Sequence, residues 1–580
     1  MTKSILSLFL LTLASHALLG QACAPPNAQL DIHANNIQAR ILTGGDLFWD
    51  LNEGRFIPNP DPNGNGTSTI FSAGFWIGGL DPGGNLKMAV AHYRSNSKTD
   101  FWPGPLDPLT GNADANSCSN WDKQFRVTSS EIAAFQADLP NLVGNPDAAI
   151  AQYPSIMGWP GRNNPYFSSV WGFDLPTAGF TSLAGFFDVN NNGAYDPLQG
   201  DYPAVSLRGL VPFVADEMIW CVFNDEGSGS VHALSGAPGL KVEVQLTTWA
   251  FNCPDNPALN NAVFTAHKTI FRGTEALDSC FVGLFVDPDI GCFADDYYGC
   301  NPELNTFFAY NTDAVDGSPG SNCSSSSSFG DNPPVQSVTF LSYPMEKFIG
   351  INNSGVGVWP SGTTDPSFTP EYYNYLTGHW RDGSPISQGG SGYQSGGAET
   401  DYIFPDDPSS PSGWSMCTSN LPMGDVRCLG IAQPGSVFGD EFKGKIWPGQ
   451  VDEYVTAWMV HPNPDLPCGL GSTFADVQKA HDAYNNGFAD LCSASGVLTP
   501  TLDNVKVFPN PAAQTFTIQY GDQTPKSIQL FSADGRLVKS LRPDGPRQTE
   551  VFVNDLPIGL YTVQMQNETG IQSVKISVIR

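Results

Sequence analysis

Hydrophobic residues recur along most of this chain in short runs, and turn-forming residues separate one run from the next. Many runs alternate apolar and polar positions, which places successive side chains on opposite faces of a strand. Several are rich in Val, Phe, Thr and Trp, residues that are enriched in strands. Strands are therefore predicted in residues 30–51 (a pair broken by two glycines), 69–81, 86–94, 217–225, 240–251, 262–273, 280–289 and 451–460.

Two segments carry a helical pattern instead. Thr128 and Glu131 have the spacing of a capping box, which predicts a short helix over residues 130–139. Farther along, Val477, Ala480 and Tyr484 would share one face of a second helix, predicted over residues 474–488. We find no repeat of 20–50 residues, which argues against a solenoid or a propeller.

The composition agrees with a mainly β protein. The chain has 60 Gly and 47 Pro among 580 residues, 41% hydrophobic residues and only 14% charged ones, which favours short strands joined by many turns. A chain of this length exceeds a single hydrophobic core, so two or three domains are expected. The predicted fold class is a large β-sandwich-like body with long loops and few short helices, followed by a small all-β domain.

The N-terminus has the pattern of a secretory signal peptide over residues 1–20. Lys3 precedes an apolar run at residues 5–14, and small residues then lead to a cleavage site near Gly20. The run is too short to be read as a membrane-spanning helix. Cys23 offers the alternative of a lipoprotein, although the sequence GQAC is a poor lipobox.

All 12 cysteines lie beyond this signal, and an even number in an exported chain favours disulfides. No CxxC pair indicates zinc or redox chemistry. Connectivity does not follow from sequence. The pairs that are nearest along the chain are the simplest expectation: Cys292 with Cys300, Cys417 with Cys428, and Cys468 with Cys492.

The last 76 residues contain several short strands with spaced motifs between them. A PNP turn follows the first strand, an Asp-Gly hairpin turn follows the third, and an L-x-x-G-x-Y segment enters a later strand. The closing strand VKISVIR carries basic residues. The motif residues are Pro509, Asn510, Pro511, Asp534, Gly535, Leu556, Gly559, Tyr561 and Lys575.

With these motifs, residues 505–580 resemble the type A C-terminal sorting domain of cargo for the type IX secretion system. The resemblance implies a small all-β sandwich, recognition by the outer-membrane secretion machinery, and a secreted or cell-surface location in a Gram-negative bacterium. The chain would then comprise a signal peptide (1–20), a β-rich exported body of one or two subdomains (21–495), a linker (496–504) and the sorting domain (505–580).

Patches of the body are similar to a group of large type IX cargo proteins that have no established activity. The similar patches are residues 71–79, 188–203, 286–300, 372–383 and 404–408.

Charge is distributed unevenly between the two parts. From residue 501 onward the chain has 8 basic and 7 acidic residues, whereas the remainder has 19 basic and 50 acidic residues. A body this acidic would repel nucleic acid and anionic lipid, and we expect neither as a partner. Its carboxylates suit divalent cations, although acidity also keeps exported proteins soluble.

One loop has the opening spacing of a calcium-binding loop. Alternate positions are acidic or amide side chains, a Gly follows for the sharp turn, and position 7 would contribute its backbone carbonyl. Gln199 replaces the usual Glu at position 12, so a later Asp would close the shell. The alternative is a loop of Asx turns that bond only their own backbone. The predicted structural calcium ligands are Asp188, Asn190, Asn192, Ala194, Asp196 and Asp201.

A second acidic cluster, Asp287, Asp289, Asp295 and Asp296, is a weaker calcium prediction. Four carboxylates within ten residues repel one another unless a cation or solvent separates them. A solvated surface loop is the competing interpretation. The segment from Asp61 to Gly66 repeats the same opening spacing without an acidic residue to complete it.

Catalytic motifs are not found in the sequence: it has no GxSxG, no HExxH and no phosphate-binding Gly-rich loop. Paired carboxylates for glycoside hydrolysis would be spatial pairs, and Glu217 and Glu371, each beside aromatic residues, are the first two to test. Trp380 and Trp414 lie in Gly-rich loops, where each ring more often pins its loop to the core than stacks on a ligand.

The sequence therefore predicts an exported cell-surface or secreted protein whose body is a calcium-stabilised binding or adhesion module for a surface glycan or protein. The alternative is a secreted hydrolase acting on glycan or protein. No catalytic residue is assigned.

Overall fold

The computed structural model describes residues 23–94, 98–176, 183–229, 231–317, 323, 328–355, 358–463, 467–489, 491–492, 505–520, 524–525, 527–532, 537–543, 545, 547–554, 556–566 and 571–579. The predicted signal peptide, the linker at residues 496–504 and the Asp534–Gly535 turn lie outside these residues. Within them the chain is mainly β, as predicted.

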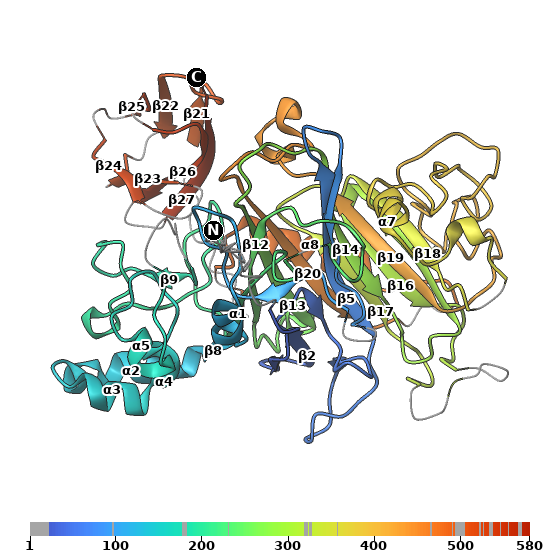
Figure 1. Ribbon diagram of the computed structural model, residues 1–580, viewed down its shortest axis with the longest axis horizontal. Helices are drawn as coiled ribbons and strands as arrows, with labels where there is room; N and C mark the ends of the chain where they lie inside the picture. The colour runs from blue at the N-terminus through green and yellow to red at the C-terminus, as the bar shows by residue number, and fades with distance from the viewer. Residues whose placement is uncertain are drawn as a thin grey trace, which may run out of the picture.

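Two nine-stranded antiparallel sheets form the body (Figure 1). The first has the order β1 (Gln29–Ile32), β2 (Ile37–Leu42), β3 (Asp46–Leu47), β5 (Ser72–Leu80), β14 (Asp278–Asp287), β19 (Val426–Ala432), β18 (Lys347–Asn352), with β4 (Phe56–Pro58) on β2 and β6 (Leu86–Ala89) on β5. The second has the order β15 (Asp296–Asn301), β16 (Thr306–Asn311), β17 (Val335–Phe340), β20 (Val451–His461), β13 (Ala262–Phe271), β12 (Val242–Ala250), β11 (Glu217–Asn224), β7 (Trp102–Pro103), with β8 (Phe125–Thr128) on β11.

The two sheets face each other across one core. Phe75 on β5 stacks on the His267 ring of β13 at 4.9 Å between centroids and lies 6.2 Å from the Tyr454 ring of β20. These contacts join strands of different sheets, as in a β-sandwich. The predicted sandwich-like body is therefore confirmed.

The second sheet is buried on both faces. Along β20, Tyr454 and Trp458 belong to the core between the sheets, whereas Val455 and Met459 belong to a second core on the other side. A strand with two covered faces has little need of polar positions, because neither set of side chains meets water. This explains why residues 454–460 are apolar apart from Thr456.

Helices cover the outer core of the second sheet. Most come from an insertion between β7 and β11 and from the C-terminal end of the body (Figure 1). The helices are α1 (Ala115–Trp121), α2 (Ser129–Leu142), α3 (Pro146–Gln152), α4 (Pro154–Met157), α5 (Phe167–Trp171), α6 (Pro257–Asn260), α7 (Thr369–Leu376) and α8 (Thr473–Asn485), and 3-10 turns lie at Pro197–Gln199, Pro302–Leu304, Ser361–Thr363, Ser436–Phe438 and Asp440–Phe442.

The two predicted helices are confirmed as α2 and α8. The Thr128 hydroxyl accepts the N–H of Glu131 and the Glu131 carboxylate accepts the N–H of Thr128, which completes the predicted capping box. The helix continues three residues beyond the predicted end, to Leu142, because Pro140 is tolerated inside it. None of the described helices has the length and apolar content that a membrane span requires.

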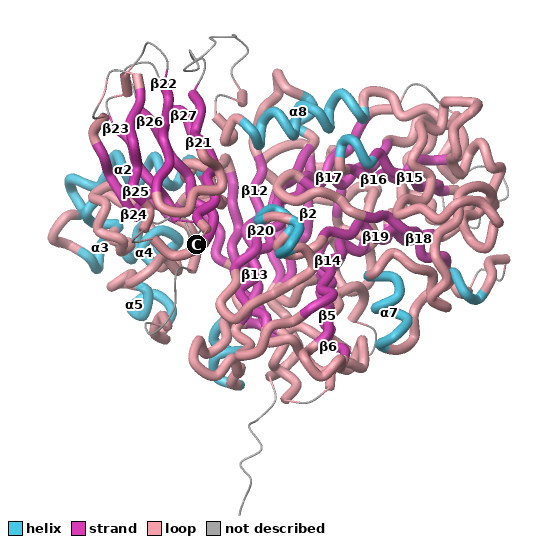
Figure 2. Tube along the Cα trace, turned by 90° about the horizontal axis from the view of Figure 1, so that it is seen from above, coloured by secondary structure: helices cyan, strands magenta, loops and turns pink. Residues whose placement is uncertain are grey.

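The C-terminal domain is a small sandwich beside the body (Figure 2). One sheet has the order β21 (Val505–Phe508), β22 (Thr515–Tyr520), β25 (Gln548–Phe552), and the other β24 (Leu537–Leu541), β23 (Ser527–Ser532), β26 (Gly559–Gln566), β27 (Ile571–Val578). Phe516 and Ile518 of the first sheet share a core with Val563 and Ile576 of the second. This agrees with the predicted all-β domain.

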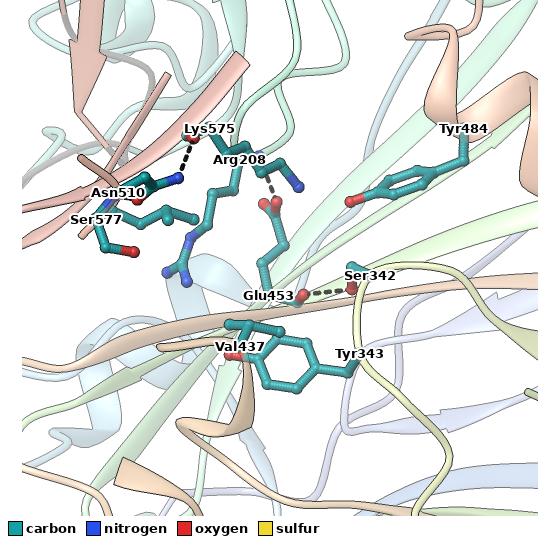
Figure 3. Close-up of a pocket in the computed structure, with 10 residues that line it drawn as sticks. Arg208, Ser342, Tyr343, Val437, Glu453, Tyr484, Asn510, Lys575 and Ser577 are labelled. Carbon is teal, nitrogen blue, oxygen red and sulfur yellow. Dashed lines mark hydrogen bonds between the residues drawn. The ribbon is translucent and has the colours of Figure 1, made fainter. Parts of the chain in front are cut away.

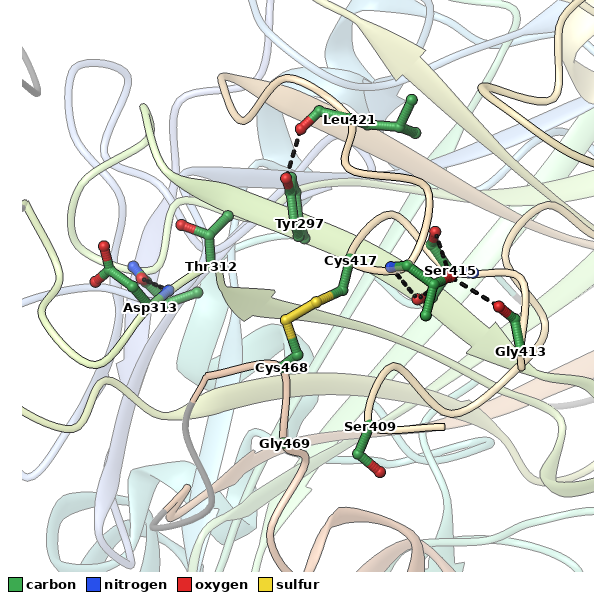
Figure 4. The surroundings of a disulfide bond; sticks show 12 residues. Tyr297, Thr312, Asp313, Ser409, Gly413, Ser415, Cys417, Leu421, Cys468 and Gly469 are labelled. Carbon is green, nitrogen blue, oxygen red and sulfur yellow. Dashed lines mark hydrogen bonds between the residues drawn. A yellow bond between two sulfur atoms is a disulfide. The ribbon is translucent and has the colours of Figure 1, made fainter. Parts of the chain in front are cut away.

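Four disulfides are present among the described residues: Cys23–Cys118, Cys253–Cys492, Cys292–Cys323 and Cys417–Cys468. All three pairs expected from nearness in sequence are wrong. Cys300 and Cys428 point into the core between the sheets and stay unpaired, as do the buried Cys221 and Cys280. Figure 4 shows Cys417–Cys468 beside Tyr297, whose hydroxyl donates to the Leu421 carbonyl at 2.5 Å.

The bridge at Cys23 also bears on the lipoprotein alternative. The Sγ atom of Cys23 is bonded to Cys118, and the residue is buried. A thiol engaged in this bridge cannot carry a thioether-linked lipid.

Candidate metal centre

The predicted calcium loop connects β9 (Phe186–Phe187) to β10 (Tyr202–Pro203), a two-stranded antiparallel ribbon. Phe187 and Tyr202 face each other across the ribbon, and their rings stack at 5.1 Å. A cross-strand aromatic pair of this kind fixes the two ends of the loop. All six predicted ligands lie on this one loop, between residues 188 and 201.

Backbone N–H groups already occupy most of the predicted ligand oxygens. Asp188 accepts the N–H of Asn192 at 3.2 Å and that of Gly193 at 2.8 Å, and Gly193 has the left-handed φ of +75°. Asn190 Oδ1 accepts the N–H of Asn192 at 3.0 Å, and Asn192 Oδ1 accepts that of Ala194 at 2.7 Å. These are the Asx turns of the alternative interpretation.

Asp201 closes the loop from its other end. Its carboxylate is buried and accepts the N–H groups of Val189 and Asp196, both at 2.8 Å. Desolvation raises the pKa of Asp201, and the charges of Asp188 and Asp196 raise it further. In the described part of the chain, however, these three carboxylates do not bring three ligand atoms within 4.8 Å of one another, as a shared cation would need.

The second acidic cluster meets that criterion with a partner from elsewhere in the chain. Ligand atoms of Asp287, Asp289 and Asp425 lie within 4.8 Å of one another. Asp287 ends β14, and Asp425 directly precedes β19, the antiparallel neighbour in which Cys428 pairs with Val286. Strand pairing therefore brings the two acidic loop ends together.

Arg427 is the cation of this group. Its guanidinium lies 2.9 Å from an Asp425 oxygen, 3.6 Å from Asp287 and 3.9 Å from Asp365, and it donates to the Tyr93 hydroxyl at 3.1 Å. Tyr93 in turn donates to Asp287. One guanidinium thus faces three carboxylates, and Asp289 adds a fourth without any ion pair among the described residues.

The protonation equilibria reflect this imbalance of charge. Burial raises the pKa of Asp287 to about 7, despite the opposing effect of Arg427. Burial and then the charge of Asp287 raise the pKa of Asp289 well above its ordinary value. Asp287 Oδ1 is buried without a hydrogen-bond partner in the described part of the chain. A bound cation would supply what this oxygen lacks.

Asp295 belongs to a neighbouring group with Asp316 and Cys292, whereas Asp296 belongs to neither group. Asp295 Oδ2 accepts the N–H of Gly317 at 2.9 Å, Asp296 Oδ2 accepts that of Ile290 at 3.0 Å, and Asp316 accepts that of Cys292 at 2.9 Å. These three carboxyl groups are almost wholly buried.

Burial is also the main cause of their altered acidity. It raises the pKa of Asp316 to about 6 and that of Asp296 well above its ordinary value, and Asp289 raises the latter further. Cys292 lies beside Asp295 and Asp316, but its sulfur is bonded to Cys323 and is not a thiolate ligand. An all-oxygen group of this kind suits a hard cation.

Sequence reasoning missed Asp316, Asp365, Asp425 and Arg427. They lie between 20 and 140 residues from the predicted cluster and reach it only through strand pairing and long loops. Asp425 stands alone between Gly424 and Val426, without the spaced acidic residues of a metal loop, so no local signal identifies it. The spacing from Asp61 to Asn65, by contrast, forms an exposed Asx turn in which Asp61 accepts the N–H groups of Asn63 and Asn65.

The two acids considered for hydrolysis are both held in ion pairs. Glu217 is buried on β11, 2.5 Å from the Arg126 guanidinium, and accepts the N–H of His33 at 2.7 Å. Glu371 on α7 lies 2.9 Å from Arg381. Each carboxylate is thus engaged by a guanidinium of the described chain, so these contacts give no support to a pair for glycoside hydrolysis.

The two loop tryptophans pin their loops to the core, as expected. Trp380 is 1% exposed and Trp414 is 8% exposed. The indole N–H of Trp380 donates to the Gly392 carbonyl at 3.0 Å, and that of Trp414 donates to the Gly390 carbonyl at 3.1 Å. Neither ring is free to stack on a ligand.

The described motif residues of the tail lie in the turn after β21, in the connection before β26, and on β26 and β27. Asn510, between Pro509 and Pro511, donates through Nδ2 to the Lys575 carbonyl at 2.9 Å and accepts the Ser577 N–H through Oδ1 at 2.9 Å. The PNP turn is therefore fastened to the closing strand β27. Leu556 and Tyr561 are buried in the domain core, and Gly559 begins β26.

Comparison with solved structures gives only weak likenesses. A polysaccharide lyase aligns with 58% of this chain and 34% of its own length, at 8% identity and a TM-score of 0.17. The BSP domain of a biofilm-associated protein aligns with 98% of this chain and 84% of its own length, at 8% identity and a TM-score of 0.13. This chain thus spans about a third of the lyase, and neither score is high enough to bear on fold or function.

No curated protein matches the chain. Residues 506–580 match the family model of the secretion system C-terminal sorting domain. That domain is the small sandwich of β21 to β27, with the PNP turn and closing strand described above. The chain is therefore a type IX secretion cargo protein that ends in a C-terminal sorting domain, and it is secreted or held at the cell surface.

Proposed function

We propose that the body is an extracellular binding or adhesion module whose loops are held by calcium, delivered to its place of action by the sorting domain. The observation that carries the proposal is the group of Asp287, Asp289 and Asp425, with ligand atoms within 4.8 Å of one another around a single guanidinium. Calcium is the proposed ion because it takes six to eight oxygen ligands in flexible geometry.

The group lies at the base of a long connection between two neighbouring strands of the first sheet. Residues 353–425 join the adjacent antiparallel strands β18 and β19 and contain α7 together with Trp380 and Trp414. At the base of this connection the N–H of Asn353 donates to the Asp425 carbonyl at 3.3 Å, and the N–H of Ser354 donates to the Asp365 carboxylate at 2.9 Å. A cation there would fix both ends of the connection at once.

Such an arrangement suits a protein that binds through its loops. Long connections cannot order themselves unless they bury enough surface to offset the entropy of the chain. A metal that binds only the folded form stabilises that form by mass action. We therefore propose that this loop platform presents the binding surface for a glycan or a protein ligand.

The loop of residues 188–201 stays a predicted second calcium loop. A bound ion would have to share or displace the backbone N–H groups that its oxygens now accept. We accordingly assign the larger stabilisation to the Asp287 group.

Thermal unfolding of the full mature chain tests the proposal. The midpoint is measured in calcium at about tenfold excess over chelator, and again in chelator alone. We expect calcium to raise the unfolding midpoint of the native chain by several degrees, corresponding to about 3 kcal/mol at a hundredfold excess over the dissociation constant. Asp289→Asn should remove most of this difference. Asp61→Asn, on an exposed turn of the same type of sequence, is the matched control and should retain it.

A midpoint that is the same with and without chelator would contradict the calcium assignment. The ligand is tested separately by binding of the labelled chain to immobilised polysaccharides and proteins in calcium and in chelator. Calcium-dependent retention supports a binding module, whereas turnover of a polysaccharide or protein in the same assay would identify a hydrolase.

A further inference from the structure

The sorting domain is docked on the body through the open face of its four-stranded sheet. Along β26, Tyr561 and Val563 point into the core of the sorting domain, whereas Thr562 points the other way and is still only 4% exposed. The body loop at Gly209 covers it: a Cβ added to Gly209 would lie 3.0 Å from Thr562 Oγ1 and 2.7 Å from Lys575 Cε. Gly209 has a φ of +78°, so glycine suits both the backbone and the close approach.

A cavity of about 230 Å³ remains at this junction (Figure 3). Residues of both domains line it, among them Arg208, Glu453 and Tyr484 from the body and Lys575 and Ser577 from the sorting domain. Because one water occupies roughly 30 Å³ in the liquid, the space is large enough for a small ion with several waters.

Arg208 is a buried guanidinium without a carboxylate partner. The residue is 8% exposed, and one terminal nitrogen donates to the Val451 carbonyl. Nε and the other terminal nitrogen have no hydrogen-bond partner, and no acidic side chain lies within 4 Å of the guanidinium, among the residues that the structure describes. A buried charge left in this state is costly, because nothing replaces the water it has lost.

Glu453 does not neutralise this guanidinium. Its carboxylate accepts the backbone N–H of Arg208 at 2.5 Å and is directed to the main chain rather than to the side chain. The guanidinium lies instead over the Phe438 ring, at 5.2 Å from the centroid. Its remaining N–H groups are available to a ligand in the cavity.

Lys575 brings a second cation to the same cavity from the sorting domain. Its ammonium group lies over the Tyr484 ring at 5.8 Å from the centroid. Desolvation by the surrounding walls lowers the pKa of Lys575, the nearby charge of Arg208 lowers it further, and the Glu453 carboxylate raises it. Docking therefore places two cations beside the single carboxylate of Glu453, which leaves one positive charge in excess for an anion to neutralise.

We propose that this cavity binds a tetrahedral oxyanion of the sulfate or phosphate class, and that the site is complete only when the sorting domain is docked on the body. Arg208 would donate from the body side, and Lys575 with the Ser577 hydroxyl from the sorting side. Oxygens that point in several directions can meet donors on both walls. The anion then links the two domains, and its binding and their docking stabilise each other.

Isothermal titration of the full mature chain with sodium sulfate, at constant ionic strength in chloride, measures this site. We expect saturable binding of one sulfate per chain. Lys575→Gln should weaken the affinity about tenfold or more, as the loss of a charge-assisted hydrogen bond implies. Lys506→Gln, on an exposed position of β21 in the other sheet, is the matched control and should leave the affinity unchanged.

Arg208→Gln should weaken sulfate binding to a similar degree. If this variant does not fold, Lys575→Gln decides, because Lys575 lies on the edge strand of the sorting domain and outside both cores of the body. Absence of saturable sulfate binding, binding of acetate in preference to sulfate, or equal sulfate affinity in the native chain and Lys575→Gln would each overturn the proposal. A sugar phosphate titrated in the same way distinguishes a free ion from an anionic group carried on a larger ligand.

Discussion

Two acidic regions of the body look alike in sequence and differ in structure. In the loop of residues 188–201, alternate Asp and Asn side chains follow a calcium-loop spacing, and their oxygens accept neighbouring N–H groups. Around Asp287 and Asp289 the spacing is irregular, yet carboxylates from separate strands gather around Arg427, and one oxygen is buried without a hydrogen bond.

The difference shows that a calcium-loop spacing in the sequence does not by itself leave carboxylates without hydrogen-bond partners, and that such carboxylates can occur without the spacing. A short loop can satisfy its own carboxylates through Asx turns, because backbone N–H groups lie within two to five residues. Carboxylates that converge from different strands have no such donors nearby. Their mutual repulsion and the cost of burying their charges therefore stay uncompensated. Convergence in space is therefore the stronger indication of a cation.

The largest expected effect comes from removing the one cation of the Asp287 group. Arg427→Met would leave Asp287 and Asp425 without their guanidinium, and we expect it to lower the free energy of unfolding by ~3–5 kcal/mol in chelator. Denaturant unfolding measures the loss. Calcium should restore part of it, because a bound cation can replace the missing charge.

Lys479→Met is the matched control for that variant. Lys479 is half exposed on α8, and its partner Asp476 keeps the Ser472 hydroxyl and the His461 ring as partners, so the change should cost far less than Arg427→Met. An Arg427→Met protein as stable as the native chain would show that the carboxylates around it are not strained by their mutual charge.

The second expected effect is a pH dependence that calcium reverses. Burial raises the pKa of Asp287 to about 7 and that of Asp316 to about 6, so the folded state holds these protons more tightly than the unfolded state. In chelator, these two groups should therefore lower stability as pH rises from about 4 to about 7. With calcium bound to the Asp287 group, its ionised carboxylates are favoured, and the part of this fall that comes from Asp287 should disappear.

Unfolding midpoints at half-unit intervals of pH between 5 and 7.5, with calcium and with chelator, measure the effect. The variant Asp289→Asn should show a shallower fall in chelator, because it removes a carboxyl group whose own pKa is raised and a charge that raises the pKa of Asp296. A midpoint in chelator that rises steadily over this range would contradict the assignment.

The smallest effect is expected at the other acidic region. Asp201→Asn would place an amide group against the N–H groups of Val189 and Asp196, which both need an acceptor. We expect a loss of ~1–3 kcal/mol in chelator and only a slightly larger loss in calcium, because the larger calcium stabilisation is assigned to the Asp287 group. A clearly larger loss in calcium would identify this loop as a metal site in its own right.

The sequence predicted the long buried strands well, because their patterns are local. Residues 262–273 and 451–460 became β13 and β20, and the Thr128 capping box began α2. Short elements escaped prediction. β19 is a buried strand between β14 and β18, but its seven residues include Arg427 and Gly430, which interrupt an apolar pattern. Helix α4 has only four residues, too few to show a helical period.

The candidate centre was half predictable. Asp287 and Asp289 stand out because acidic residues crowd there, whereas Asp425 becomes a neighbour only through the pairing of β14 with β19. The disulfides failed for the same reason. Cys417 bridges to Cys468 and Cys253 to Cys492, partners that depend on which strands lie together rather than on distance along the chain.

The Cys253–Cys492 bridge has a consequence for the stability of the body after removal of the sorting domain. Cys492 is the last cysteine before the sorting domain begins at β21, and its partner lies 239 residues earlier, just after β12. A peptidase that cut anywhere between Cys492 and Val505 would remove the sorting domain and leave the disulfide of the body intact. The new C-terminus would stay covalently bound to the body near α6. Local unfolding of the body would therefore not start from this end.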